Sequence, residues 1–297
     1  MRNMKKWIAS LFLATVFMSV VTGCGKDDGI KVDKSAITIV YTNDVHSYID
    51  NVVTDEEGNI LGNGFRFSKI AAMVEDMKAD GGNVLLVDAG DEIQGDIYGA
   101  MDEGETIINL MKATGYQLAT PGNHDFDYGV MQLLKLAENA GFPYVTCNFH
   151  ATDGSETTFS NSSIFDIGGK KVAFVGVTTP ETMLSSTPVY FQDEKGEFIY
   201  TIDGLSDAND LYASVQNAVD EVKDQVDYVI GIGHLGVGID ETKKGWDSKS
   251  VIAKLFKKLF IPFYCCITIF LSSCTKVVTY SNISKIYLRS SLMGLSI

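Results

Sequence analysis

Short apolar runs rich in β-branched residues alternate with segments of helical periodicity along most of the chain. Strands are predicted for Ile37–Tyr41, Val84–Val87, Tyr144–Cys147, Lys171–Val177 and Tyr228–Ile232, and helices for Phe65–Lys78, Thr106–Ala113, Val130–Asn139 and Leu211–Val222. Because strands that alternate with amphipathic helices are covered by those helices, the pattern predicts an α/β fold. A Gly168-Gly169 pair between two apolar runs predicts one β-hairpin.

The N-terminal residues have the layout of a secretory signal. Basic residues precede an apolar run from Trp7 to Val21, which is shorter than the ~20 residues that a membrane-spanning helix needs. A transmembrane anchor is therefore the weaker alternative. The segment Val21-Thr22-Gly23-Cys24 resembles a bacterial lipobox, which implies a signal peptide over residues 1–23, a lipidated Cys24 and a tether over residues 24–35. We expect an exported protein that is lipid-anchored to the bacterial cell membrane.

The charge balance excludes one class of partner and points to a metal. The formal net charge of −14 argues against binding to nucleic acid, which needs clusters of basic side chains. An acidic protein that handles phosphates is expected to bring positive charge as bound metal ions. Cys147 is the only cysteine between Gly25 and Asp247, so this region has no disulfide, and its thiol is predicted to be buried.

The composition changes abruptly near Ser248. All 38 acidic residues precede this position, whereas the segment from Ser248 to Ile297 holds seven Lys or Arg residues. A C-terminal membrane segment is one explanation, but Pro262 interrupts an apolar run that is short for a span. We favour a reading-frame change near Lys254, which makes residues 36–254 the folded domain and residues 255–297 an atypical tail.

Four segments place potential metal ligands directly after predicted strands, where the edge of a parallel sheet binds ligands. The first contains Asp44 and His46, and the second, Asp88-Ala89-Gly90-Asp91, ends in a carboxylate after a glycine turn. The third is Gly122-Asn123-His124-Asp125-Phe126-Asp127, and the fourth ends at His234. Three of the four histidines in the chain fall in these segments, whereas His150 lies in a polar stretch and is predicted to be on the surface.

Together these segments resemble the metallophosphoesterase signature, and in their detailed form they resemble the bacterial 5′-nucleotidase branch. The resemblance covers about Ile37 to Lys254. It implies a four-layer α-β-β-α sandwich in which two β-sheets pack face to face between helices. It also implies hydrolysis of nucleotide phosphate esters outside the cytoplasm.

The resemblance assigns roles to individual residues. It implies that Asp44 and His46 hold one divalent ion, that Asp91 bridges two ions, and that Asn123 and His234 hold the second. Two further roles follow for the catalytic pair: His124 stabilises charge in the transition state, and Asp127 orients its imidazole. Carboxylate and imidazole ligands suit zinc, manganese or a similar ion.

The sequence departs from the family pattern after His234. Family members supply two further ligands from a Gly-His-x-His or Gly-His-x-Gln segment on the next strand, expected here near Val251, and this chain has no histidine after His234. We also expect this chain to lack the C-terminal domain that holds the nucleobase in the family. We therefore expect a sandwich that is incomplete at its C-terminus and an impaired enzyme.

Three alternatives remain open. Gly231, Gly233 and Gly236 match the dinucleotide-binding fingerprint, although no acidic residue follows at the expected distance. A second alternative is a lipid-anchored surface protein that keeps the fold for binding alone. The third lies within the same class of enzymes, because 2′,3′-cyclic phosphodiesterases and sugar-nucleotide hydrolases use the same first domain.

Overall fold

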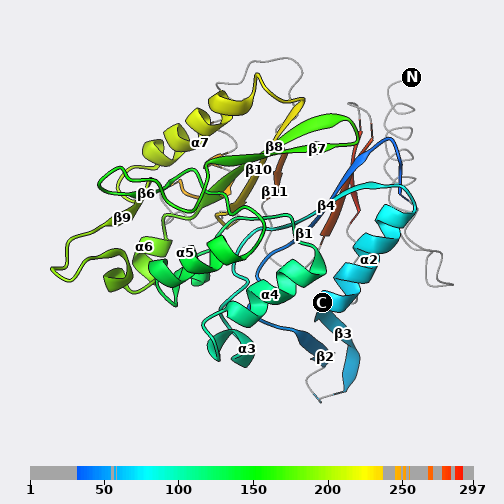
Figure 1. Cartoon of the computed structure of the whole chain (residues 1–297), viewed down its shortest axis with the longest axis horizontal. Coiled ribbons are helices and arrows are strands. Elements are labelled where there is room, and N and C mark those ends of the chain that lie inside the picture. Colours follow the sequence, from blue (N-terminus) through cyan, green and yellow to red (C-terminus); the bar gives the residue numbers. More distant parts are fainter. Residues whose placement is uncertain are drawn as a thin grey trace, which may run out of the picture. The chain divides into compact units, whose positions relative to one another are not determined.

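A computed structural model of the chain describes residues 32–54, 57, 59–236, 245–248, 250–251, 254, 267–269, 276–281 and 285–289. Within the sheets and hairpins the strands are β1 (Ile37–Thr42), β2 (Asp50–Thr54), β3 (Ile60–Arg66), β4 (Asn83–Asp88), β5 (Leu118–Ala119), β6 (Phe149–Ala151), β7 (Ser162–Ile167), β8 (Lys170–Thr178), β9 (Tyr200–Ile202), β10 (Tyr228–His234), β11 (Ile267–Ile269), β12 (Lys276–Ser281) and β13 (Lys285–Arg289). The helices are α2 (Phe67–Ala79), α3 (Ile97–Ala100), α4 (Glu105–Thr114), η1 (His124–Phe126), α5 (Val130–Asn139), α6 (Thr182–Ser185), η2 (Pro188–Phe191) and α7 (Ala208–Val222). The predicted α/β class is confirmed (Figure 1).

Two sheets form the centre of the fold. The first has the strand order β13-β12-β1-β4-β5, and the second has the order β11-β10-β8-β7. β1 runs parallel to β4, and β10 runs parallel to β8. The predicted hairpin joins β7 to β8, and its Gly168 and Gly169 have φ angles of 58° and 73°, which suit glycine.

Alternation of side chains along the strands builds a separate core on each face. Ile39 and Tyr41 of β1 face the second sheet, where they pack in one cluster with Phe174 of β8 and Ile232 of β10. Val40, between them in the sequence, belongs to the cluster on the opposite face. This period of two is expected for strands that are buried on both faces.

Helices cover the two outer faces of the paired sheets. α2, α4 and α5 pack on the first sheet, through residues such as Ile70, Ile107 and Leu133. α7 packs on the second sheet, where Val215 lies in one cluster with Val175. The predicted four-layer order of helix, sheet, sheet and helix is therefore confirmed, with α7 on one side of the strands and α2 and α4 on the other (Figure 1).

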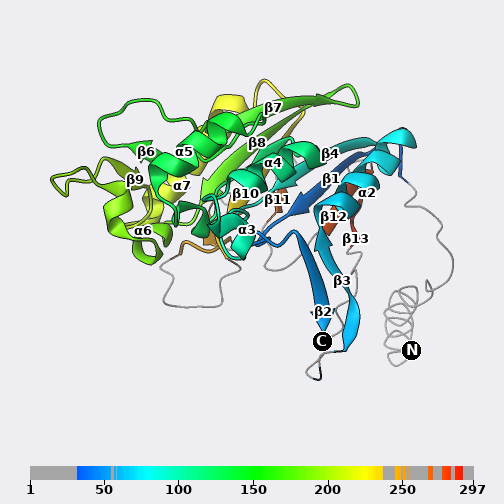
Figure 2. The ribbon, with the colours of Figure 1, turned by 60° about the horizontal axis from the view of Figure 1, so that its bottom comes forward.

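Several predicted elements differ in detail. The segment Tyr144–Cys147 makes isolated bridges through Tyr144 and Val145 and is not a ladder strand, because the chain turns toward β6. The predicted helix at Phe65 begins two residues later, since β3 extends to Arg66. The β2–β3 hairpin was not predicted, and Figure 2 shows it extending away from the sheets. Cys147 is buried and unpaired, as predicted.

The C-terminal tail also differs from expectation. The last strands of the fold were expected to be missing, yet β11 pairs in parallel with β10, and β12 pairs antiparallel with β1. β-Branched residues are frequent in these tail strands, and this property favours pairing at a sheet edge. Near Val251, where a strand was expected to begin, the described residues are helical, and Val251 packs with the α7 core.

The expected signal peptide and Cys24 lie outside the described residues. Every helix in the described part of the chain is too short or too polar to span a bilayer.

The core between the sheets gives a first testable prediction. Phe174 is fully buried there, with its ring edge-to-face against Phe165 at a centroid distance of 5.8 Å. Phe174→Ala should lower the free energy of unfolding by about 3 to 5 kcal/mol, measured by urea denaturation, because it leaves a cavity between two rigid sheets. Ile164→Ala is the control, since Ile164 is 43% exposed on the neighbouring strand. Equal losses in the two variants would contradict the proposed inter-sheet core.

Candidate metal centre

The parallel strands bring distant parts of the chain to one edge of the fold. Asp44 and His46 follow β1, Asp91 follows β4, and His234 is the last residue of β10. Parallel strands of a sheet end at the same edge, so side chains that follow them can converge. The structure brings these four predicted site residues together.

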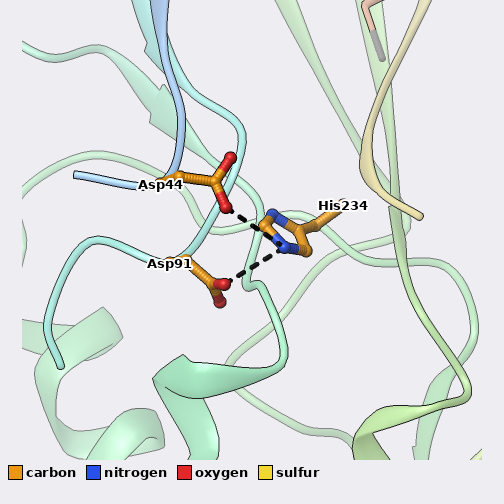
Figure 3. A group of neighbouring side chains, drawn as sticks. All are labelled: Asp44, Asp91 and His234. Carbon is orange, nitrogen blue, oxygen red and sulfur yellow. Dashed lines mark ion pairs between the residues drawn. The ribbon is translucent and has the colours of Figure 1, made fainter. Parts of the chain in front are cut away.

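Three of these residues form a compact group of potential metal ligands. One ligand atom from each of Asp44, Asp91 and His234 lies within 4.8 Å of the other two. His234 Nε2 is 3.2 Å from Asp91 Oδ2 and 3.9 Å from Asp44 Oδ1. Figure 3 shows both carboxylates directed toward the imidazole of His234. Asp91 is the most buried of the three, because its side chain is only 3% exposed.

His46 approaches the same two carboxylates. Its Nε2 is 3.9 Å from Asp91 Oδ2 and 4.0 Å from Asp44 Oδ1. Its Nδ1 is 3.0 Å from the carbonyl oxygen of Gln94, and His234 Nδ1 is 3.0 Å from the carbonyl oxygen of Ala89. Since a carbonyl can only accept, each Nδ1 carries hydrogen, and Nε2 is the ring atom that each imidazole turns toward the carboxylates.

The loops that carry these residues adopt an unusual backbone conformation. Asp44, His46 and Asp91 have positive φ angles of 52°, 49° and 62°. Each such residue costs of order 1–3 kcal/mol, which the surrounding contacts must offset. The two loops hold each other: the Asp44 amide donates to the Gly90 carbonyl at 2.9 Å, and the His46 amide donates to the Asp91 carbonyl at 2.8 Å.

A buried carboxylate, Asp125, ties the loop after β4 to the loop after β5. It accepts hydrogen bonds from the amides of Asp91 and Gly122 at 2.9 and 2.7 Å, and from those of Glu92 and Ile93 at 3.1 and 3.2 Å. Asp125 is fully buried, so these four amides replace the hydrogen bonds that water would otherwise donate to its carboxylate. Asp125 lies in the third predicted segment, but no role was predicted for it, because nothing in the sequence indicates which amides it contacts.

Two further buried carboxylates, Asp88 and Glu92, stabilise the loop that carries Asp91. This role was not predicted from the sequence. Burial raises the pKa of Asp88 to about 7 and holds the pKa of Glu92 well above its usual range. Glu92 accepts a hydrogen bond from the Tyr144 hydroxyl at 2.6 Å, and Asp88 accepts one from the Gly90 amide at 2.8 Å. Asp88 and Glu92, on either side of Gly90 and Asp91, therefore anchor the loop that presents Asp91.

The third segment places a histidine and a carboxylate side by side. His124 Nδ1 is 2.7 Å from Asp127 Oδ2, and the His124 imidazole lies edge-on to that of His46 with a centroid distance of 5.4 Å. The His124 amide donates to Asp91 Oδ1 at 2.8 Å. Asn123 directly precedes this amide and is partly buried.

Electrostatics favour protonated imidazoles beside ionised carboxylates in the metal-free protein. Burial alone lowers the pKa of His234, but the hydrogen bond and charge of Asp91 and the charge of Asp44 outweigh it and raise this pKa to about 9. Burial likewise opposes ionisation of Asp91, yet His234 and His124 hold the pKa of Asp91 below its usual range. For His124, the burial penalty is outweighed by Asp127 and Asp91, which raise its pKa.

The donor set fits divalent metal ions. Two carboxylates and two imidazoles with converging ligand atoms are typical of zinc and manganese sites. Asp91 Oδ1 already accepts the His124 amide, so Oδ2 is the atom left free to face a cation. A bound cation would take the place of the proton on His234 and satisfy the clustered negative charge.

Two other predictions can be compared with the structure. His150 is half-buried, and its Nε2 lies 2.7 Å from Asp203 Oδ2, so it has a partner that the sequence did not indicate. Gly231 and Gly233 lie inside β10, whereas a dinucleotide fingerprint needs its first glycines in the turn after the strand. The glycine pattern therefore does not build a dinucleotide site here.

Comparison with known proteins gives a family match. A sequence profile described as calcineurin-like phosphoesterase matches residues 37–266. The 5′-nucleotidase of Diplobatis ommata is 30% identical over 218 residues, which cover 69% of this chain and 34% of that protein. This chain thus spans about a third of the length of that relative.

Solved structures agree with this match. The 5′-nucleotidase precursor from Thermus thermophilus has a TM-score of 0.57 at 26% identity, covering 70% of this chain and 39% of that chain. A calcineurin-like phosphoesterase from Bacillus subtilis has a TM-score of 0.63 at 19% identity, covering 86% of this chain and 88% of the other, and it supports the fold alone.

The hydrogen bonds through which Asp125 links the two loops can be tested by measuring the free energy of unfolding. Asp125→Ala leaves four buried amide donors without an acceptor, so it should lower the free energy of unfolding by roughly 3 kcal/mol in urea with EDTA present. Asp153→Ala serves as the control, because Asp153 is exposed and accepts only from nearby residues such as the Ser155 amide. A loss at Asp125 no larger than that at Asp153 would show that the four hydrogen bonds do not hold the loops.

Proposed function

The chain belongs to the calcineurin-like phosphoesterase family, and from this premise we propose that it hydrolyses phosphate esters of nucleotides with the help of two divalent ions. Asp44, His46, Asp91, Asn123 and His234 would hold the ions, with Asp91 shared between them. The observation that carries this proposal is the position of Asp91 Oδ2, 3.2 Å from His234 Nε2 and 3.9 Å from His46 Nε2. Zinc and manganese are the ions that best suit these ligands.

When bound, such a pair of ions lowers the pKa of a water molecule and neutralises charge on the phosphoryl oxygens. The protein's own part is to hold its ligand atoms in place beforehand. The carbonyls of Gln94 and Ala89 set the tautomers of His46 and His234, and the backbone hydrogen bonds between the two loops fix Asp44 and Asp91. This preorganisation reduces the rearrangement that binding requires.

His124 and Asp127 are proposed as the catalytic pair. Hydrolysis forms a bond from a water oxygen to phosphorus and breaks the ester P–O bond, and the leaving oxygen gains charge that must be stabilised or protonated. The His124 side chain is 44% exposed, so a substrate can reach it, while Asp127 holds its Nδ1. Asp127 and Asp91 raise the pKa of His124, which favours the protonated imidazole that can stabilise that oxygen.

The names of similar proteins support a nucleotide substrate. The proteins from Diplobatis ommata and Thermus thermophilus are both named as 5′-nucleotidases. Cyclic nucleotides and sugar nucleotides are the alternative substrates within the same reaction class. A non-catalytic surface protein is the alternative outside it.

We further propose that the protein acts outside the cytoplasm, anchored through lipid on Cys24. The supporting observation is the Val-Thr-Gly-Cys segment after a short apolar run. Cys24→Ala should shift the protein out of the membrane fraction. Membrane retention of this variant equal to that of the wild type would contradict the anchor.

Substitution of the shared carboxylate tests the metal-dependent activity. Asp91→Asn should lower the affinity for manganese, measured by calorimetry, by more than the 10- to 100-fold that loss of a supporting group costs. Phosphate release from a nucleoside monophosphate should fall with it. Asp96→Asn is the matched control, because Asp96 lies in the same loop, caps α3 and can keep that cap as asparagine.

The outcomes separate the alternatives. Metal binding without hydrolysis of any phosphate ester by the wild type would favour the non-catalytic protein, and hydrolysis of a 2′,3′-cyclic nucleotide alone would favour that substrate class. Equal manganese affinity in Asp91→Asn and wild type would refute the proposed centre.

A further inference from the structure

The carboxylate of Asp127 has a second partner besides the imidazole. Asp127 Oδ2 is 2.7 Å from His124 Nδ1, and its other oxygen, Oδ1, accepts a hydrogen bond from the Ser186 hydroxyl at 3.1 Å. A carboxylate held at one oxygen can rotate about its χ2 angle, whereas one held at both oxygens is fixed in orientation. The direction of the His124 ring therefore depends on the partner of Oδ1.

The Ser186 hydroxyl reaches a second acceptor on the same turn. Its oxygen is 3.2 Å from the carbonyl oxygen of Asn123, and the residue is only 4% exposed. One hydroxyl supplies one proton, which the ionised carboxylate attracts more strongly than the neutral carbonyl does. Ser186 therefore donates to Asp127, and its oxygen lies near the Asn123 carbonyl at the start of the turn that carries His124.

The segment that carries Ser186 is itself well anchored. Ser186 directly follows α6, and its amide donates to the Thr182 carbonyl at 3.0 Å. Further along, Phe191 of η2 stacks on Phe126 with a centroid distance of 5.6 Å, and both rings are fully buried. Phe126 immediately precedes Asp127, so the α6–η2 segment contacts the turn through one polar and one aromatic anchor.

We propose that Ser186 is a positioning residue that fixes the His124–Asp127 pair in the orientation needed for catalysis. This inference rests on the proposed function and deepens it. Ser186 does not act on the substrate itself: its hydroxyl orients Asp127, and Asp127 orients the imidazole. The α6–η2 segment, which follows β8, is thereby part of the catalytic apparatus although it contributes none of the proposed metal ligands.

Kinetics test the role through its dependence on His124. Ser186→Ala removes one oxygen atom, and we expect kcat for a nucleoside monophosphate, with manganese added, to fall by roughly 10- to 100-fold with KM little changed. That range corresponds to the loss of one hydrogen bond to a charged group. Ser186→Thr keeps the hydroxyl and should recover most of the lost rate. Ser185→Ala is the matched control, since the exposed Ser185 hydroxyl contacts only the Glu181 carbonyl.

A double-mutant cycle separates positioning from a merely structural effect. If Ser186 acts through His124, Ser186→Ala should cost nothing further in a His124→Ala background. Losses that multiply in the double variant, or a Ser186→Ala enzyme as fast as the wild type, would overturn the inference.

A second measurement does not depend on activity. The chain has only four histidines, so the imidazole N–H signals can be assigned by proton–nitrogen NMR of the metal-free protein. The His124 Nδ1–H signal should be slow to exchange in wild type and in Ser185→Ala, and broadened or lost in Ser186→Ala. An unchanged signal in Ser186→Ala overturns the inference. If the wild type hydrolyses no ester, the proposed function fails, while this spectrum still decides whether Ser186 positions His124.

Discussion

The site depends on one buried carboxylate, Asp91, that lies between two imidazoles. Its Oδ2 faces His234 and His46, and its Oδ1 accepts the amide of His124. Burial alone disfavours this charge, so the chain surrounds it with donors and positive groups that hold its pKa down. The same arrangement that stabilises the carboxylate without metal makes it an attractive ligand for cations, because the ring protons can be exchanged for metal ions.

The fold makes this convergence possible by turning long separations in sequence into short distances in space. His234 is far from Asp44 along the chain, yet their ligand atoms lie 3.9 Å apart because β1, β4 and β10 end at one edge. Strand ends alone do not set the geometry, however. Hydrogen bonds that Asp125 accepts from backbone amides, together with those between the two loops, compensate the strained backbone at Asp44, His46 and Asp91.

Much of this could be predicted from the sequence, and the reasons are local. Period-two and helical patterns are local properties, so the main strands and helices were predicted correctly, whereas the four layers were implied by the family resemblance. The same holds for the segments that supply Asp44, His46, Asp91 and His234, since each follows a recognisable strand. The prediction of a strand at Tyr144 was wrong because an apolar β-branched run indicates only an extended segment. Whether that segment pairs in a sheet depends on distant strands.

The supporting residues could not be predicted, because their roles depend on contacts between elements. Ser186 and Glu92 are ordinary polar residues in the sequence, and only the fold brings them to Asp127 and Tyr144. The partner of His150 was missed for the same reason. The tail strands β11 to β13 were missed because composition, which marks the change near Ser248, does not determine pairing at a sheet edge.

Anomalous X-ray diffraction from crystals soaked in manganese would locate the ions around Asp91. Two peaks are predicted about 3.5–4 Å apart, one on each side of Asp91 Oδ2, with Asp44 and His46 around the first and Asn123 and His234 around the second. Full manganese occupancy elsewhere on the molecule, with no peak beside Asp91, would contradict the account.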